Sequence, residues 1–455
     1  MSKNFDILIV GAGPAGSLCA ILLARQGYRV AVIAAPRGRG RVEGFSERTV
    51  EILAIHGLRH AHAAVGPMVE RFASWAGEHG ARNREHVTDR SPFDEALLKD
   101  LADHDVTALS PDTVSASSKP DSVVVSLRGD NTERHYHAKF FVEARGRAAP
   151  AGRDKSLSGP ATTAMVRQVD GAVGDARTAV AGFANGWAWF VADGSGPAYL
   201  QIFIDSRAGL PKRDALADFF ESHVAEIAEK DGWLEGRGFT GPVMAHSSAS
   251  VLATSPLATR MIRIGDAACA LDPLSGNGLF AALSGAAAAS PVIHTLIEKS
   301  ENEDLAKAFY GDRVRDTFDR FSRIGRDFYR LETRWPDTLF WRTRQVWPDD
   351  QPAHAAPLSG PVNFTVGPVV EDGLIVEREV CITPDYPRGI WQIDQVPIAR
   401  LFHILAEYDG RSYQDALPEI QTRLATSARQ LKTAVEWLRY RNVLDKSDTI
   451  QLRGR

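Results

Sequence analysis

The chain has 455 residues, a formal net charge of −4 and a hydrophobic content of 44%, values that are ordinary for a globular protein of two or three domains. The slightly acidic balance gives no electrostatic reason to expect nucleic acid or an anionic membrane as a partner. The three cysteines lie far apart without a Cys-x-x-Cys motif, which argues against a disulfide framework and leads us to expect a soluble, cytoplasmic protein.

The N-terminal stretch has the order strand, glycine turn, helix and strand. An apolar run covers residues 5–10, the segment Gly11-Ala-Gly-Pro-Ala-Gly16 follows it at once, and a second β-rich run covers residues 28–34. A glycine motif in this context is the fingerprint of dinucleotide binding. The pyrophosphate is expected at the positive end of the helix that begins near Pro14.

Each glycine of this turn has a separate role in such a site. Gly11 allows the tight turn, Gly13 lets backbone N–H groups approach the pyrophosphate, and Gly16 lets the helix pack closely on the strand. The turn residues predicted to bind the cofactor are Gly11, Gly13, Pro14, Ala15 and Gly16.

The next segment lacks one usual feature of dinucleotide sites. Ala34 and Ala35 stand where many such folds carry an acidic residue for a ribose hydroxyl, so side-chain recognition of adenosine is expected to be weak. Ser46 is the predicted N-cap of a helix over residues 46–56, and Arg48 lies on its first turn. Spacing alone favours neither a solvated Arg48 nor one that reaches the cofactor.

Residues 161–249 have a different character, with many β-branched and aromatic residues. The runs 161–169, 187–193 and 198–205 predict strands of a separate antiparallel sheet. A sheet inserted in an α/β domain commonly covers a cofactor, so this region is predicted to be the substrate-side domain.

The α/β pattern returns at residues 261–264, a predicted strand that leads directly into Gly265-Asp266. A carboxylate at this place can accept hydrogen bonds from polyol hydroxyls, and glycines at a helix start present N–H groups that stabilise negative charge on an isoalloxazine ring. A long helix of small residues is predicted to follow, up to about residue 299. The predicted cofactor contacts of this second motif are Asp266, Pro273, Gly276, Asn277 and Gly278.

Over about residues 1–346 the two motifs make the chain resemble the single-component flavoprotein monooxygenases and flavin-dependent halogenases, which share one fold. The resemblance implies that FAD lies between the motifs with Asp266 on its ribityl chain, and that Arg48 and Arg90 meet the cofactor. NAD(P)H is the expected electron donor and O2 the expected co-substrate. The catalytic residues stay unknown, and no metal site is predicted.

Two further motifs are similar to the halogenase-like branch. They are Glu143-Ala-Arg-Gly-Arg147 at a strand end and Gly186-Trp-Ala-Trp189, although Phe190-Val-Ala replaces the pattern expected after the second tryptophan. Halogenases of this family also need an active-site lysine early in the chain, and no lysine lies between Lys3 and Lys99. This difference disfavours halogenation and favours oxygen transfer.

The segment 310–334 is predicted to form one long helix with an apolar stripe and interleaved arginines and aspartates. Charge alternation of this kind is typical of a solvated face with salt bridges, and docking of an acidic polypeptide is the alternative. The aromatic residues that follow, at positions 335, 340, 341 and 347, are expected to cap a core, with a cage for an aromatic substrate as the alternative.

A linker rich in proline and alanine is predicted at 347–362, and strands followed by three helices predict a winged-helix-like domain at 363–455. Residues 363–446 hold ten Lys/Arg against twelve Asp/Glu, and this net −2 argues against nucleic acid. The domain resembles the peptide-recognition domains of modified-peptide biosynthesis at Glu407-Tyr-Asp-Gly410-Arg-Ser and Trp437-Leu-x-x-x-x-Val443-Leu. Such domains bind an extended peptide as an added strand.

The predicted fold class is α/β, with a Rossmann-type FAD-binding domain at 1–160 and 250–346, the inserted antiparallel sheet at 161–249, and the small C-terminal α+β domain. The combination resembles flavoprotein monooxygenases that hydroxylate a peptidyl tryptophan during tryptophylquinone biogenesis for quinohemoprotein amine dehydrogenase. The implied partner is a polypeptide that carries the target tryptophan. Two alternatives stay open, a tryptophan halogenase and a small-molecule aromatic hydroxylase with a structural or DNA-binding tail.

Overall fold

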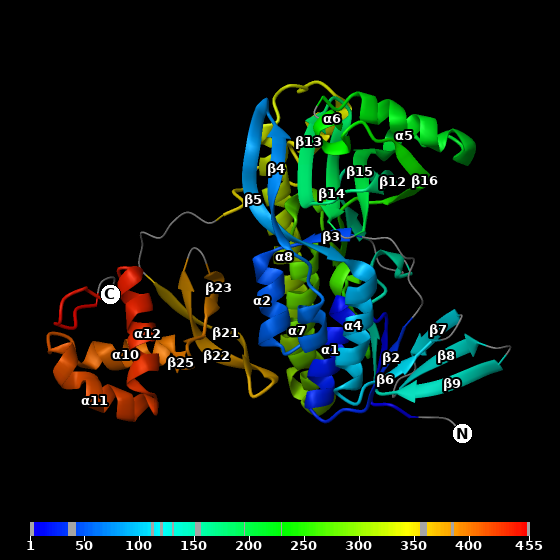
Figure 1. Cartoon of the computed structure of the whole chain (residues 1–455). Coiled ribbons are helices and arrows are strands. Elements are labelled where there is room, and N and C mark those ends of the chain that lie inside the picture. Colours follow the sequence, from blue (N-terminus) through cyan, green and yellow to red (C-terminus); the bar gives the residue numbers. More distant parts are fainter. Residues whose placement is uncertain are drawn as a thin grey trace. The chain divides into compact units, whose positions relative to one another are not determined.

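The computed structural model describes residues 4–34, 42–110, 113–118, 122–129, 132–150, 156–194, 196–228, 230–354, 362–383 and 386–452 (Figure 1). Contacts within the chain divide it into two compact units. Unit 1 comprises Met1–Ser300 and Tyr310–Ala353, and unit 2 comprises Glu301–Phe309 and His354–Arg455. Ala35 and part of the predicted linker, residues 355–361, lie outside the described residues. The finer domain boundaries stay a prediction.

Unit 1 is built on a six-stranded sheet in the order β18-β19-β10-β1-β2-β6. All its pairs are parallel except that of the edge strand β18. The strands are β1 (Ile7–Val10), β2 (Val30–Ile33), β6 (Thr107–Leu109), β10 (Phe140–Glu143), β18 (Leu257–Ala258) and β19 (Met261–Arg263). Every residue of β1, β2 and β10 is buried, as expected of parallel strands covered on both faces.

Helices cover one face of the six-stranded sheet, and a small sheet covers the other. The helices α1 (Pro14–Arg25), α4 (Arg90–Ala102) and α7 (Gly278–Glu298) lie side by side (Figure 1). A three-stranded sheet of β7 (Thr113–Ser118), β8 (Val123–Gly129) and β9 (Thr132–Ala138) packs its apolar side chains on β1 and β2. Because β2 and β10 flank β1 on opposite sides, the order of strands reverses at β1. Ligands of open α/β sheets bind at such a point, at the carboxyl ends of the strands.

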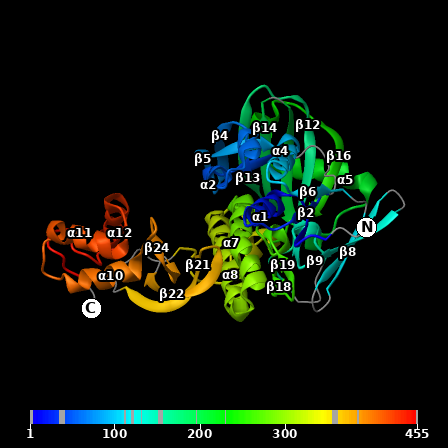
Figure 2. The ribbon, with the colours of Figure 1, turned by 90° about the horizontal axis from the view of Figure 1, so that it is seen from below.

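The substrate-side sheet has eight strands in the order β16-β12-β15-β14-β13-β4-β5-β3. Five come from the predicted region: β12 (Thr162–Ala172), β13 (Ala176–Phe183), β14 (Gly186–Asp193), β15 (Pro197–Asp205) and β16 (Phe239–Ser247). The helix α5 (Leu216–Ala225) covers one face, where Phe220 and Val224 join the core (Figure 2).

Three strands from earlier in the chain complete this sheet, and the sequence analysis did not predict them. They are β3 (Val42–Phe45), β4 (Met68–Trp75) and β5 (Glu78–Asp89), and β4 pairs with β13 in parallel. The sheet is therefore mixed and extends beyond residues 161–249. β5 carries almost no apolar residue before Val87, because most of it is solvent-exposed, so hydrophobic alternation could not reveal it.

The helix α7 is long and apolar enough to cross a membrane by length and composition. In unit 1 it packs against α1 and α2 (Glu47–Ile55), and ten of its side chains are buried. These contacts make it the packed internal helix that its alanine-rich sequence predicts.

The arginines of the long helix α8 (Glu303–Leu331) bind the chain's own carboxylates. Arg323 donates to both carboxylate oxygens of Asp349 at 2.9 and 2.7 Å, and Arg330 donates to Asp350 at 2.6 Å. The buried Arg326 binds Asp327 at 2.7 Å. This part of the helix is therefore a salt-bridged face.

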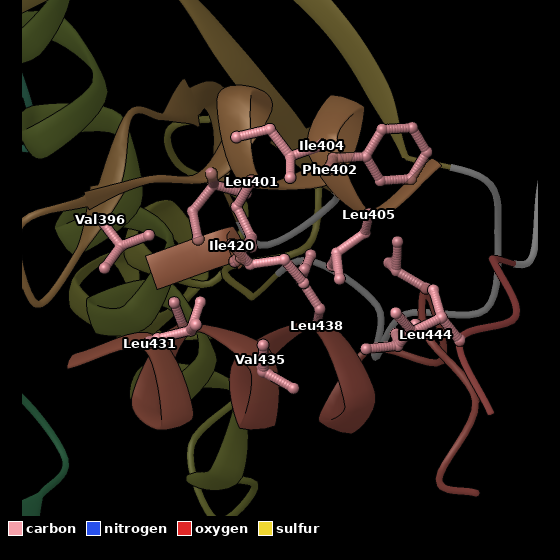
Figure 3. Packing of buried hydrophobic residues seen from close by; sticks show 14 of the residues in the cluster. Val396, Leu401, Phe402, Ile404, Leu405, Ile420, Leu431, Val435, Leu438 and Leu444 are labelled. Atoms are coloured by element: carbon pink, nitrogen blue, oxygen red, sulfur yellow. The ribbon is translucent and has the colours of Figure 1, made fainter. Parts of the chain in front are cut away.

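Unit 2 contains an antiparallel sheet of β21 (Asn363–Glu371), β22 (Leu374–Thr383) and β23 (Tyr386–Ile390). A small ladder of β24 (Gln392–Ile393) and β25 (Val396–Pro397) leads to α10 (Ile398–Glu407), α11 (Tyr413–Leu424) and α12 (Ala428–Tyr440). Aliphatic side chains of the three helices form its core (Figure 3). Ser412 caps α11, and Ser427 caps α12 as part of a full capping box.

The remaining elements are short. They are α3 (Arg59–Ala63), α6 (Lys230–Leu234), α9 (Leu339–Arg344), β11 (Ser156–Ser158), β17 (Val251–Ala253) and β20 (Cys269–Ala270).

Candidate functional site

The first glycine motif lies at the carboxyl end of β1, where β1 leads into α1. Gly13 is the N-cap of α1 in an extended conformation, and no side chain caps the helix there. The first N–H groups of α1 are therefore without a side-chain cap, as a phosphate site requires. Gly11 has φ +115°, and a Cβ on it would lie 2.3 Å from the carbonyl oxygen of Ala144. A Cβ on Gly16 would lie 1.9 Å from the carbonyl oxygen of Gly11.

The structure brings the second motif against the first. The backbone N–H of Ile264 donates to the carbonyl of Glu143 at 3.0 Å, which aligns the ends of β19 and β10. Gly265 follows with φ +57°, and a Cβ on it would lie 2.9 Å from the Cβ of Ala15. Two motifs far apart in the sequence thus meet at the carboxyl ends of the strands of the six-stranded sheet.

Asp266 lies in a cavity of about 250 Å³ that also exposes Gly146 and Arg147. Its side chain keeps 37% of its surface accessible, and its Oδ2 is 3.7 Å from Nε of Arg147. Desolvation by the surrounding atoms raises the pKa of Asp266, while Arg147 opposes that rise. A recessed carboxylate with free surface is suited to accept hydrogen bonds from a polyol such as the ribityl chain.

Arg147 holds this wall of the cavity together, a role that the sequence did not assign to it. Its guanidinium donates to the carbonyl of Leu271 at 2.9 Å and to the carbonyl of Ala249. Just before it, Glu143 is buried and pairs with Arg145. The motif at the end of β10, quoted above only as a family likeness, therefore shapes the site.

The loop from Asp272 to Gly278 leads from the cavity into α7. Pro273 opens a short 3-10 turn, Gly276 adopts φ +62°, and Asn277 is the N-cap of α7. The α7 N-terminus begins at Gly278, so the backbone N–H groups of a second helix start also lie in this region.

A buried polar chain connects this loop to an aromatic cluster. Tyr329 donates from Oη to the carboxylate of Asp272 at 3.2 Å, and Trp187 donates from Nε1 to Tyr329 Oη at 3.2 Å. Trp187 stacks on Phe203 with ring centroids 3.8 Å apart. The aromatic cluster comprises Trp187, Phe203, Tyr329, Phe340 and Trp341 and packs on Leu274 of the loop. No local spacing in the sequence could have paired Asp272 with Tyr329.

Burial raises the pKa of Asp272 above its ordinary range. A carboxyl group with a raised pKa in the folded state contributes stability at low pH that is lost as the pH rises through that pKa. We therefore expect Asp272→Asn, which keeps an acceptor for Leu274 N–H and Tyr329, to be more stable than the unaltered protein at neutral pH and no more stable near pH 4. Thermal unfolding of both proteins across this range tests it, and a constant difference in melting temperature would refute it.

The two predicted arginines differ in their surroundings. Arg48 is exposed on α2, and its guanidinium lies 5.2 Å from the ring centroid of Phe280 in the first turn of α7, beside the second motif. Arg90 donates to Glu43 at 2.9 Å and to Asp94 at 2.8 Å and is mostly buried. Their contacts with a cofactor stay a prediction.

Comparisons with known proteins agree with this geometry. Residues 4–314 match the family model described as FAD binding domain. The structure of the peptidyl tryptophan dihydroxylase QhpG, essential for tryptophylquinone cofactor biogenesis, is 36% identical, covers 97% of this chain and 100% of its own, and gives a TM-score of 0.82. The putative FAD-dependent oxidoreductase LodB of Marinomonas mediterranea is 24% identical over 76% of this chain and 98% of its own.

The flavin-dependent halogenase CmlS is 19% identical with a TM-score of 0.72, covers 100% of this chain and 99% of its own, and shows the shared fold alone. The fit of the glycine turns, the helix N-terminus and Asp266 to a flavin dinucleotide agrees with the family match. The position of FAD between the two motifs stays a prediction. The chain belongs to the family of the FAD binding domain.

Proposed function

We propose that this protein is an FAD-dependent monooxygenase that hydroxylates a tryptophan side chain within a polypeptide, as a step in the biogenesis of a peptide-derived quinone cofactor. The observation that carries the proposal is the 36% identity with the peptidyl tryptophan dihydroxylase QhpG, which extends over 97% of the chain and so includes unit 2. The halogenases share the fold at lower identity, and the early lysine that their chemistry needs is absent here.

Bound FAD supplies the redox chemistry, with NAD(P)H as the proposed electron donor and O2 as the proposed co-substrate. The chain's own residues bind the FAD and exclude water from the site. The α1 N-terminus receives the pyrophosphate, and Asp266 accepts hydrogen bonds from the ribityl hydroxyls. The aromatic cluster, with Trp341 fully buried, excludes water from one side of the loop at Leu274.

The proposed partner is a polypeptide in the cytoplasm. Neither nucleic acid nor a membrane is part of the proposal. Residues 363–446 carry a net −2, and α7, which among the described residues is the helix both long and apolar enough to cross a membrane, packs inside unit 1. The three-helix core of unit 2 supports a separate binding module for the substrate polypeptide.

The test compares the full-length chain with a chain that ends at Ala353, both loaded with FAD and used to capture polypeptides from the native host's cytoplasm. We expect intact-mass spectrometry to find a small polypeptide on the full-length chain alone, and this polypeptide should gain one or two oxygen atoms at a tryptophan when the flavin is reduced in air. Asp266→Ala serves as the control that captures the polypeptide but, because it binds FAD more weakly, oxidises less of it. Gain of a halogen would favour the halogenase, and oxidation of free aromatic compounds alone would favour the small-molecule hydroxylase.

A further inference from the structure

The strand β16 forms one edge of the eight-stranded sheet. It pairs with β12 on one side, with Ser247 opposite Thr163 and Met244 opposite Val166. Within the described part of the chain, no strand pairs with its other side. Its last four residues are exposed, and Met244 keeps 44% of its surface accessible. Such an edge presents backbone groups to which another chain can pair.

The hydrogen-bond pattern between β16 and β12 determines which backbone groups of β16 face outward. The N–H of Ser248 donates to the carbonyl of Thr162 at 2.8 Å, so this opposed pair is a hydrogen-bonded one. Bonded and non-bonded pairs alternate in an antiparallel ladder, so Met244 and His246 also bond to β12. Ala245 and Ser247 therefore point their N–H and C=O groups away from the sheet, about 7 Å apart.

A groove of about 520 Å³ lies over this end of β16 and the adjoining end of β12, and β16 contributes Ala245, His246 and Ser247 to its lining. The other lining residues are small or hydroxyl-bearing apart from Leu210, and none of the groove's lining residues is Asp, Glu, Lys or Arg. A neutral, hydroxyl-rich groove suits a peptide main chain, whereas a phosphate-bearing ligand needs cationic partners.

The groove adjoins the cavity that holds Asp266. Ser247 lines both the groove and the cavity that holds Asp266. Two residues further, the carbonyl of Ala249 accepts a hydrogen bond from Arg147, which lines the same cavity. A strand added to β16 at Ser247 would therefore lie beside the Asp266 cavity.

We propose that the substrate polypeptide docks as an added β-strand on the outward edge of β16 at Ala245–Ser247, which aligns its target residue with the Asp266 cavity. The identity of this occupant rests on the proposed function. Main-chain pairing would give affinity with little demand on sequence, and the groove would select neighbouring side chains. This edge belongs to unit 1 and would act in addition to any site on unit 2.

The experiment uses a display library of peptides of about twelve residues with a fixed central tryptophan, selected on the full-length chain loaded with FAD. Ala245→Pro removes one outward N–H but no bond to β12, and the extended conformation of Met244 is compatible with a following proline. Ala245→Val keeps the N–H and is the matched control. We expect the proline variant to bind the selected peptides about five- to tenfold more weakly and the valine variant to bind them normally.

A second measurement does not depend on a variant. Peptide binding to the unaltered chain should slow hydrogen exchange of the Ala245 and Ser247 amides, while those of Met244 and His246 are already protected by β12. Equal peptide affinity of the proline and valine variants, unchanged exchange at both outward amides, or a library that yields no binder would each reject the docking edge. A selected peptide that depends on Ala245 but gains no oxygen when the flavin is reduced in air would retain the docking edge and refute the proposed function.

Discussion

Replacement of Gly16 by alanine is expected to abolish FAD binding and to lower the free energy of unfolding of unit 1 by about 3 kcal/mol. The added Cβ would lie 1.9 Å from the carbonyl oxygen of Gly11 and 3.2 Å from the Cβ of Ala144. The carbonyl oxygen of Gly11 belongs to the backbone and cannot move aside by a change of rotamer, so α1 must move away from β1 and β10. That movement displaces the helix N-terminus that receives the pyrophosphate. FAD titration and urea unfolding measure the two effects.

The matched control is Gly285→Ala in the middle of α7. This glycine is also helical, but a Cβ on it meets no atom within 4 Å. Alanine stabilises a helix interior relative to glycine by about 0.5–1 kcal/mol, so this variant should bind FAD normally and unfold at equal or higher denaturant. If Gly16→Ala bound FAD as well as Gly285→Ala does, the close approach of α1 and β1 would not be required for the site.

The second large effect is expected at Asp266. Replacement by alanine should weaken FAD binding by about 10- to 100-fold, since a hydrogen bond to a charged group contributes about 1.5–3 kcal/mol. The protein itself should not lose stability, because burial raises the pKa of this carboxyl and makes its charged form costly. Flavin fluorescence during titration of the purified protein gives the affinity.

Asp266→Asn is the companion variant, because its amide oxygen still accepts a hydrogen bond. This variant should retain most of the affinity for FAD. The comparison therefore separates the effect of the hydrogen-bond acceptor from the effect of the negative charge. Full FAD occupancy in Asp266→Ala would show that the Asp266 carboxylate does not bind the ribityl chain. Equal losses of FAD affinity in both variants would assign the role of Asp266 to its charge and to its ion pair with Arg147.

Local signals in the sequence were sufficient for much of the fold. The order strand, glycine turn, helix and strand is a contiguous pattern, and the glycines at 11 and 16 stand where the structure leaves no space for a Cβ. The capping serines at 46, 412 and 427 were also predictable, since each accepts a hydrogen bond from an N–H three residues later. The run of small residues after the second motif likewise predicted α7, and three helices were predicted in the C-terminal domain.

Other features depended on contacts between distant residues. The strand β5 is largely solvent-exposed and β4 is mostly half-buried, and neither has a clear hydrophobic alternation. Their pairing with each other and with β13 and β3 defines them. The contact of Arg147 with Asp266 requires the ends of β10 and β19 to be adjacent.

By itself, the sequence determined the class of fold, the two cofactor motifs and the division into a catalytic part and a C-terminal module, because each is encoded by neighbouring residues. Only the tertiary structure decided that Tyr329 binds Asp272, that the arginines of α8 pair with Asp349 and Asp350, and that β16 is an edge. The physical reason is that ion pairs, buried hydrogen bonds and sheet order join residues whose spacing along the chain carries no periodic signal.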